Sequence, residues 1–485
     1  MPYTDLIFKR SSKVDDPFII PNLIRRCMQF CPTIPILFYK IFNKPGFPMK
    51  LRAVTVLLIF AGLFVAHQPS HAQSDELKAA IDRAADEVEE QVIEWRRHFY
   101  QNPELSNREV ETADYIAGFL DDLGLEIETE IAHTGVVGVL DTGNPGPVIG
   151  LRADMDALPV EDRADVPFAS TATGEFRGEE VPVKHACGHD THMAMLMGAA
   201  QILTDMQDEL KGKIVFIFQP AEEGAPPGED GGAELMVEEG LIENYNIDTV
   251  FGLHISSNTP VGQINYRPGG IMAASDSFEI TVHGEQTHGS TPWTGVDPIV
   301  TSAQIIQGLQ TIISRKTELT NEAAVISVGI IEGGVRNNII PEETTFSGTI
   351  RTLDEDMQDK VHDEIRHTAT TIAASMGAEA EVEITRGYPV TYNDHELTEQ
   401  MLPTLLDVAG ADNVEHINPI TGAEDFSFFQ QQVPGLYVFV GGLAEGYSPQ
   451  DAPPHHTPEF KINEDGMKTG VRAHAYFVVD YLFGE

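Results

Sequence analysis

One short segment of the sequence carries an unusual density of side chains that bind metal ions. Residues 185–192 read His-Ala-Cys-Gly-His-Asp-Thr-His, just before a stretch with helical spacing. Cys187 and His189 are two residues apart, so a loop can aim both at one ion, and thiolate and imidazole are strong ligands for zinc-like metals. Asp190 can orient a ligand histidine through its second ring nitrogen. The competing interpretation is a buried thiol beside surface histidines, and His192 alone is expected to be structural.

Two adjacent glutamates, Glu222 and Glu223, follow an apolar segment that is typical of a buried strand, KIVFIF at residues 213–218. In α/β sheets the ligand crevice lies beyond the carboxyl ends of the strands. There one glutamate can bind a metal while the other stays free as a general base for a metal-bound water. A solvated acidic loop is the alternative, because paired glutamates are common in so acidic a chain.

Two further histidines complete a possible ligand set. His254 ends the apolar stretch TVFGLH, and His456 lies in the segment HHTPEF near the end of the chain. An isolated histidine at such a place usually has only a structural role in packing. These two are therefore evidence for a metal site only in combination with the thiol, imidazole and carboxylate described above. Together the side chains form a mixed sulfur, nitrogen and oxygen set sized for two metal ions, which polarise a carbonyl and generate hydroxide near neutral pH.

The elements that must position these residues alternate between strands and helices, which predicts an α/β fold with a parallel-type sheet and helices on both faces. Helices are predicted at residues 76–100, 191–206, 395–408 and about 464–482, and strands at 136–143, 147–158, 213–218, 248–255 and 436–442. The chain shows no internal repeat and no long low-complexity linker.

The pattern changes near residue 271, where a strand that alternates polar and apolar residues is followed by an amphipathic helix, two strands and a second helix. This β-α-β-β-α-β order predicts a small inserted α+β (ferredoxin-like) domain with an antiparallel sheet. We therefore expect a main domain in two parts, residues 73–270 and 386–485, with the small domain at 271–385 inserted between them.

The N-terminus resembles a secretory signal that begins inside the chain. Met49, Lys50 and Arg52 precede a short apolar run, and Ser70-His71-Ala72 follows it. A basic start, a short apolar run and small residues at the cleavage site predict a signal peptide at 49–72, hence a periplasmic or secreted protein without stable membrane association. Residues 1–48 are then a doubtful N-terminal extension from a misassigned start. A genuine basic region with an uncleaved anchor is the alternative.

Composition narrows the function classes. Of the 485 residues, 31 are Lys or Arg and 75 are Asp or Glu, giving a formal net charge of −44. The overall charge of so acidic a chain does not favour binding to a nucleic-acid backbone or an anionic membrane, so no nucleic-acid partner is expected. Cys187 would be the only cysteine after signal cleavage, so it cannot form an internal disulfide and is either inert or bound to a metal.

Seven ordered motifs resemble the M20 metallopeptidase family, in the amidohydrolase branch with hippurate hydrolases, N-acyl-amino-acid deacylases and plant auxin-conjugate (IAA-amino acid) hydrolases. They are RADMDALPV (152–160), HACGHDTHMAML (185–196), FQPAEEG (218–224), GLH (252–254), GGVRNNIIPE (333–342), GAEDFSFF (422–429) and HHTPEF (455–460). The likeness extends over residues 77–483. It implies that residues 73–270 and 386–485 form the catalytic domain and that 271–385 form a lid or dimerisation domain.

The resemblance implies a role for each matching residue. The family's metal ligands fall on Cys187, His189, Glu223, His254 and His456. Its general base falls on Glu222, and Asp156 matches an acid beside the metals. His288 matches a lid histidine that stabilises the oxyanion, often in the partner's active site. Asn338 and Arg351 match positions that bind the substrate carboxylate. For Arg351 this agrees with its chemistry, because a guanidinium binds a carboxylate bidentately. The alternative is that Arg351 is an arginine at a strand edge without a role in binding.

The expected function is therefore a metal-dependent amidohydrolase that cleaves N-acyl-amino acids, or related amides with a free carboxylate, by metal-hydroxide attack. The resemblance implies two divalent metal ions per chain, with zinc or manganese first and cobalt or nickel also used by relatives, and a homodimer. The sequence THGSTPW around His288 is closer to carboxypeptidase-type relatives, and Thr191 replaces a residue that is often small. A dipeptidase or carboxypeptidase is the first alternative, and a non-catalytic metal- or ligand-binding protein is a remote one.

Overall fold

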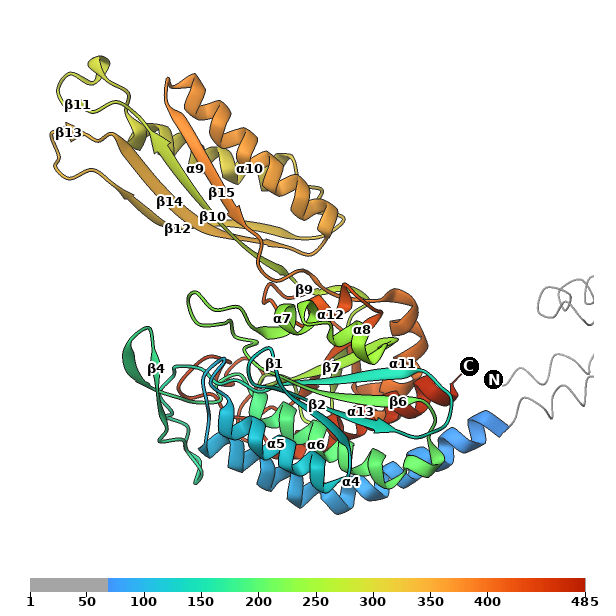
Figure 1. The fold of residues 1–485 in the computed structure, drawn as a ribbon. Coiled ribbons are helices and arrows are strands. Elements are labelled where there is room, and N and C mark those ends of the chain that lie inside the picture. Colours follow the sequence, from blue (N-terminus) through green and yellow to red (C-terminus); the bar gives the residue numbers. More distant parts are fainter. Residues whose placement is uncertain (1–68, 485) are drawn as a thin grey trace, which may run out of the picture. The chain divides into compact units, whose positions relative to one another are not determined.

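The computed structural model describes residues 69–484, and its largest element is a mixed sheet of eight strands in the order β1-β2-β6-β3-β7-β18-β8-β17 (Figure 1). The strands are β1 (Glu126–Ile131), β2 (Gly135–Asp141), β3 (Val148–Asp154), β6 (Lys213–Gln219), β7 (Thr249–Ser256), β8 (Ile264–Tyr266), β17 (Val414–His416) and β18 (Gly435–Gly441). The central strands β6, β3, β7 and β18 are parallel. They are almost continuously apolar and buried, as strands covered on both faces must be.

Helices cover both faces of this sheet. One face packs against α4 (Pro69–Gln101), α5 (Val110–Asp122), α6 (His189–Asp205), α11 (His395–Ala409) and α13 (Met467–Phe483). The other packs against α7 (Gly232–Glu238), α8 (Leu241–Tyr245) and α12 (Ser427–Gln430). Short 3₁₀ turns are η2 (Gln207–Glu209), η3 (Pro292–Thr294), η4 (Ala411–Asn413) and η5 (Glu464–Gly466). Two apolar cores, one per face, therefore fix the positions of the strand ends.

A second, antiparallel sheet has the strand order β12-β14-β10-β15. Its strands are β10 (Ala274–His283), β12 (Ala324–Gly333), β14 (Glu343–Thr352) and β15 (Glu379–Thr385), and its helices are α9 (Pro298–Arg315) and α10 (Glu355–Ser375). Both helices begin at an aspartate whose carboxylate accepts backbone N–H groups of the first turn. We call residues 274–385 the lid domain. It has its own apolar core between one face of the sheet and the two helices.

Three small pairings complete the described strands. The lid pairs β11 (Thr287–His288) with β13 (Ile339–Ile340). Beside the large sheet, β9 (Gly269–Met272) pairs with β16 (Thr391–Asn393), and β4 (Thr173–Phe176) forms a hairpin with β5 (Glu179–Pro182).

The predicted fold class is confirmed: helices lie on both faces of a sheet with a parallel centre, and the lid has the expected β-α-β-β-α-β order. The sequence analysis did not identify α5, β1 or the β4–β5 hairpin, whose strands are half exposed. The predicted extension at 1–48 and the apolar run of the predicted signal lie outside the described residues. Among the residues described, no helix is both long and apolar enough to span a membrane.

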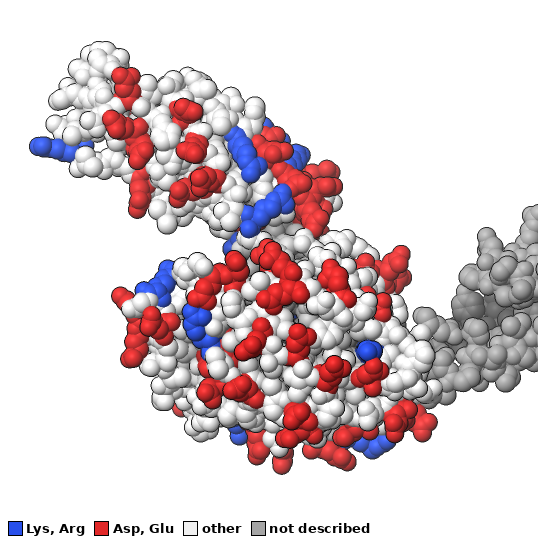
Figure 2. Space-filling model, in the orientation of Figure 1, with Lys and Arg blue, Asp and Glu red and all other residues white. Residues whose placement is uncertain are grey.

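Acidic side chains are spread over the whole visible face of the described chain rather than gathered in one patch (Figure 2). Basic side chains on that face are few and scattered between them. On this face, therefore, the negative charge is not concentrated at one site.

A buried arginine ties the carboxyl ends of the central strands together. Arg152 on β3 is 1% exposed and donates to the Gln219 side chain (2.7 Å) and to Asp154 (2.7 Å). Its Nη2 also lies 3.0 Å from an Asp425 oxygen and 2.9 Å from a Glu424 oxygen. Because an unpaired buried charge is strongly unfavourable, this network fixes β3, β6 and the 424–425 segment relative to one another.

Candidate active site

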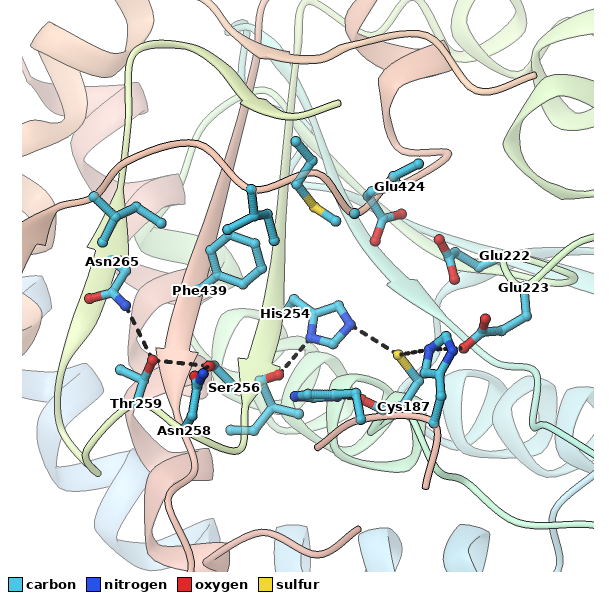
Figure 3. A pocket seen from close by; sticks show the side chains of 18 of the residues that line it. Cys187, Glu222, Glu223, His254, Ser256, Asn258, Thr259, Asn265, Glu424 and Phe439 are labelled. Atoms are coloured by element: carbon cyan, nitrogen blue, oxygen red, sulfur yellow. Dashed lines mark hydrogen bonds and ion pairs between the residues drawn. The ribbon is translucent and has the colours of Figure 1, made fainter. Parts of the chain in front are cut away.

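The predicted chemistry-bearing residues meet at one edge of the large sheet. Asp156 follows β3, Glu222 and Glu223 follow β6, and His254 lies near the end of β7. Parallel strands end at the same edge, so these side chains come together although they are far apart in sequence. Two loops add the rest: the loop before α6 brings Cys187, and the segment before η5 brings His456. A pocket of about 460 Å³ is lined by Cys187, Glu222, Glu223, His254 and His456, and the first four are labelled in Figure 3.

Cys187 lies at the centre of the cluster. Its Sγ is 3.3 Å from Nε2 of His254 and 3.2 Å from Nε2 of His456. The same His456 nitrogen is 3.1 Å from an oxygen of Glu223. Sulfur, nitrogen and oxygen donors thus converge, and Cys187, Glu223 and His456 each offer a ligand atom within 4.8 Å of the others.

The ring orientation of His254 leaves a lone pair for a metal. Its Nδ1 lies 2.6 Å from the carbonyl oxygen of Ile255, to which it must donate. Nε2, which faces Cys187, is then unprotonated in the neutral ring.

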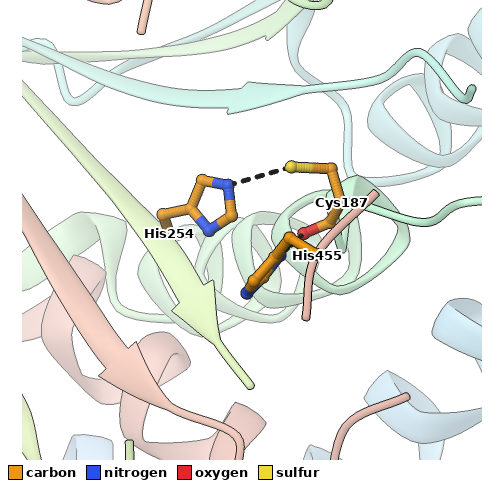
Figure 4. A group of neighbouring side chains, drawn as sticks. All are labelled: Cys187, His254 and His455. Carbon is orange, nitrogen blue, oxygen red and sulfur yellow. Dashed lines mark hydrogen bonds between the residues drawn. The ribbon is translucent and has the colours of Figure 1, made fainter. Parts of the chain in front are cut away.

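His455 belongs to the same group of side chains, with a ring nitrogen within 4.8 Å of the Cys187 sulfur (Figure 4), but both of its ring nitrogens are engaged by backbone atoms. Nδ1 donates to the carbonyl oxygen of Cys187 (2.8 Å), and Nε2 accepts the N–H of Ser257 (3.1 Å). The geometry therefore separates His254, with a free nitrogen, from His455, which supports the loop of Cys187.

His192 is held in the same way. Its Nδ1 is 2.6 Å from Asp154, and its Nε2 accepts the backbone N–H of Ile255 at 2.8 Å. Both nitrogens are engaged with protein atoms, in agreement with the expected structural role.

His189 presents one free nitrogen to the two glutamates. Its Nδ1 is 3.2 Å from Asp156, while Nε2 is buried without a hydrogen-bond partner. That nitrogen is 3.7 Å from Glu222 and 3.9 Å from Glu223. The Glu223 oxygen that faces this nitrogen, Oε1, is the one 3.1 Å from Nε2 of His456. Since buried polar atoms are almost always satisfied, an unpartnered His189 nitrogen that faces two glutamates fits a divalent cation between them.

The carboxylate of Asp156 organises this corner of the site. Oδ1 accepts from His189 and from the backbone N–H of Glu222 (3.1 Å), and Oδ2 accepts from Ser106 (2.7 Å) and from the backbone N–H of Glu223 (3.0 Å). One side chain therefore orients a candidate ligand and fixes the loop of both glutamates.

The electrostatics reflect a concentration of negative charge. Burial, together with Glu424 and Glu223, raises the pKa of the Glu222 carboxyl well above its usual value. Burial and the charge of Glu223 raise the pKa of the Cys187 thiol. Burial alone would keep the His189 ring neutral, but Asp154 and Asp156 outweigh it and raise the pKa of His189 to about 10. A bound cation relieves such repulsion between buried carboxylates.

The structure does not bring the three lid residues into this pocket. His288 on β11 is exposed and bonds to Ser290, and Asn338 lies beside it, with its carbonyl oxygen accepting the N–H of Gly289. Arg351 lies at the other end of the lid sheet, where its guanidinium donates to Ser275 (2.6 Å).

Four residues that contact the site escaped the sequence analysis. Glu424 lines the pocket and accepts from the Tyr437 hydroxyl (2.6 Å), and the Tyr388 hydroxyl donates to the carbonyl oxygen of Glu222 (2.7 Å). Lys184, fully buried, donates to the carbonyl oxygens of Pro458 (2.6 Å) and Phe460 (2.9 Å) and so holds the His456 segment.

The fourth is Glu109, which is fully buried and accepts the N–H of Ala221 (2.9 Å). Of these four residues, the sequence could have identified only Glu424, because it lies within the motif GAEDFSFF. The others lie far along the chain from the residues that they hold.

Known proteins resemble this chain over about four fifths of its length. The family described as Peptidase family M20/M25/M40 matches residues 150–480. The chain belongs to this family. It is 41% identical to thermostable carboxypeptidase 2 of Saccharolobus solfataricus over 81% of this chain and 96% of that protein. It is 36% identical to N-acetyl-L-cysteine deacetylase of Bacillus subtilis, over 81% and 88%.

A solved structure supports the metal centre. A dinuclear metal-binding peptidase of the M20 family from Bacillus subtilis superimposes with a TM-score of 0.69 at 32% identity, over 82% of this chain and 99% of that one. The protein is thus an M20 metallohydrolase that acts on amides or peptides, with a candidate metal-ligand set at the edge of its large sheet.

The ring geometry predicts which histidines hold metal. We expect His254→Ala and His456→Ala to weaken metal binding by at least about tenfold, because each removes a ligand atom that faces Cys187. His455→Asn should retain more metal than either variant, since it removes no ligand atom and only weakens the support of the Cys187 loop. Metal content after dialysis, with folding checked by circular dichroism, measures this. The exposed His416→Ala is the matched control, and full metal retention by His254→Ala would contradict the assignment.

Proposed function

We propose that the protein hydrolyses the amide bond of N-acyl-amino acids, or of related amides with a free carboxylate. The observation that carries this proposal is the place of Glu222. Glu222 is 6% exposed and lines the pocket beside the candidate metal ligands, and its backbone is held by Asp156 and Tyr388. A fixed carboxylate beside a metal site is the arrangement of a general base.

Two divalent cations would be held by Cys187, His189, Glu223, His254 and His456, with Glu223 between the two groups of donors. When bound, such cations polarise an amide carbonyl and acidify a water molecule. Glu222 takes a proton from that water and later gives it to the nitrogen of the leaving amino acid. The thiolate favours zinc by its softness, whereas the carboxylates also suit manganese.

The volume and lining of the pocket support binding of an acyl group, the part of the substrate on the carbonyl side of the amide bond. Its volume of about 460 Å³ exceeds what an acetyl group needs and lies within the usual range for small-molecule sites. Apolar side chains of Met272, Ile417, Ile420 and Phe439 line it next to the polar cluster. An apolar acyl group can lie against this wall while the amide bond reaches Glu222.

A carboxypeptidase or dipeptidase is the second candidate function. The sequence THGSTPW around His288 and the 41% identity to a thermostable carboxypeptidase favour it. The reaction would be the same, with a peptidyl group in place of the acyl group.

Replacing the base tests the reaction directly. We expect Glu222→Gln to lower kcat by about 10³-fold or more, because the amide cannot take up the proton. Metal content should stay at the wild-type level, which separates loss of the base from loss of the centre. The assay is hydrolysis of N-acetyl- and N-benzoyl-amino acids and dipeptides by metal-loaded protein. Activity of Glu222→Gln equal to that of the wild type would refute this role.

We further propose a homodimer in which His288 and Asn338 serve the partner's active site, while Arg351 serves its own. Support comes from the register of β10 and β14. Ser275 faces Arg351 at one end of the pair, and His283 faces Glu343 at the other, just before β11. A strand of this length spans about 30 Å, so one pocket cannot contact both Arg351 and His288 of the same lid in this conformation.

Mixing two inactive variants tests this arrangement. In a dimer of one Glu222→Gln chain and one His288→Ala chain, one active site has both intact residues if His288 acts across the interface. A randomly paired equal mixture should then recover about a quarter of wild-type activity. If the mixture stays as inactive as the two parents, His288 acts within its own chain or has no catalytic role.

We also propose that the protein is exported, with the signal at residues 49–72. The short apolar run and the small residues before Gln73 support this. A mature chain that begins at Gln73 is expected by N-terminal sequencing of the extracytoplasmic fraction, and an intact N-terminus there would exclude cleavage.

A further inference from the structure

The pocket continues past the candidate metal ligands to a second group of polar side chains. This distal polar cluster consists of Ser256, Asn258, Thr259 and Asn265, which follow or lie near the ends of β7 and β8. In Figure 3 Phe439 lies between His254 and Asn265. The candidate metal ligands therefore occupy one end of the cavity, and the distal polar cluster lies at the other.

A chain of hydrogen bonds runs through the cluster. Asn265 Nδ2 donates to the Thr259 hydroxyl (3.2 Å), which donates to the Ser256 hydroxyl (2.9 Å). The Ser256 hydroxyl in turn donates to Oδ1 of Asn258 (2.8 Å).

A carboxylate outside the pocket fixes the direction of this chain. Nε2 of Gln263 lies 2.7 Å from Glu415 and 2.8 Å from Oδ1 of Asn265. A carboxylate only accepts, so Gln263 must present its amide nitrogen to Glu415 and, with the same nitrogen, to Asn265. Asn265 then turns its oxygen to Gln263 and its nitrogen towards Thr259.

This direction decides what the cluster can offer a ligand. The amide oxygens of Asn258 and Asn265 already accept, and both hydroxyl protons are donated. The only protons left to donate to a ligand are amide N–H groups, one on Asn265 and two on Asn258, while each oxygen keeps one lone pair. Through these three N–H groups the cluster can bind a hydrogen-bond acceptor.

Charge restricts the acceptor further. None of the described residues that line the pocket is Lys or Arg, whereas Glu222, Glu223 and Glu424 all line it. An anionic group at the distal end would lose its hydration without gaining a counter-charge there. A neutral oxygen has no charge to desolvate and can accept hydrogen bonds from the amide N–H groups of the cluster.

We propose that the distal polar cluster is a specificity subsite for an acyl group with an apolar body and a neutral acceptor oxygen, a carbonyl or ether, at its far end. The apolar body lies against Phe439 and Met272, and Asn265 donates to the far oxygen. This inference rests on the proposed hydrolysis of N-acyl-amino acids and names the acyl class that the site selects.

Matched acyl groups test the subsite. The substrates are leucine carrying a 4-acetylbenzoyl, a 4-isopropylbenzoyl or a 4-carboxybenzoyl group, which share one shape and differ in the terminal group. A second set, 5-oxohexanoyl and 5-methylhexanoyl leucine, covers a flexible chain. The wild type should prefer the ketone of each pair by about threefold to tenfold in kcat/KM, and the carboxylate should be the poorest substrate.

Asn265→Leu keeps the size of the side chain and removes its donor. We expect it to lose the preference for the ketone, and because this is a ratio within one protein sample, incomplete folding does not affect it. Asn102→Leu, at an exposed asparagine beyond the end of α4, is the control and should keep the wild-type ratio.

Binding of the free acids 4-acetylbenzoate and 4-isopropylbenzoate, measured by calorimetry, examines the subsite without turnover. Three results would overturn the subsite while leaving the proposed hydrolysis intact. They are equal kcat/KM for ketone and hydrocarbon substrates, a preference for the carboxylate substrate, and an unchanged ketone preference in Asn265→Leu. Absence of any turnover would instead overturn the proposed hydrolysis, and tighter binding of the acetyl acid would then still support the subsite.

Discussion

The candidate site depends on the four hydrogen bonds of the Asp156 carboxylate. Each oxygen accepts one backbone N–H from the glutamate loop, and the remaining positions accept from His189 and Ser106. The orientation of a candidate metal ligand and the position of the general base are therefore set by the same group. An amide in its place has only one acceptor oxygen and cannot satisfy all four donors.

A second buried carboxylate supports the same loop from the other side. Glu109 accepts the N–H of Ala221, whose φ of 53° lies in the left-handed region that a residue with a side chain rarely adopts. Three consecutive backbone N–H groups, at residues 221–223, thus bond to two carboxylates. The loop leaves β6 in a strained conformation because these bonds hold it there, and the strain serves to direct Glu222 into the pocket.

The sequence predicted the fold class and the location of the candidate site because both rest on local patterns. Apolar runs such as KIVFIF mark buried strands, and polar residues at their ends mark the edge where ligands bind. What it could not supply is the partnership between distant residues. His254 and His455 look alike in sequence, and only their hydrogen bonds to Ile255, Cys187 and Ser257 distinguish a free nitrogen from an engaged one.

Asp156 couples the candidate metal ligand His189 to the base Glu222, and a metal titration of Asp156→Asn tests this coupling most directly. Metal affinity should fall by about 10- to 100-fold, as for other groups that orient a ligand histidine. Saturating metal should then fail to restore kcat, because the loop of Glu222 has lost its acceptor as well. Full recovery of wild-type kcat at saturating metal would contradict the account, since the base would then be positioned without Asp156.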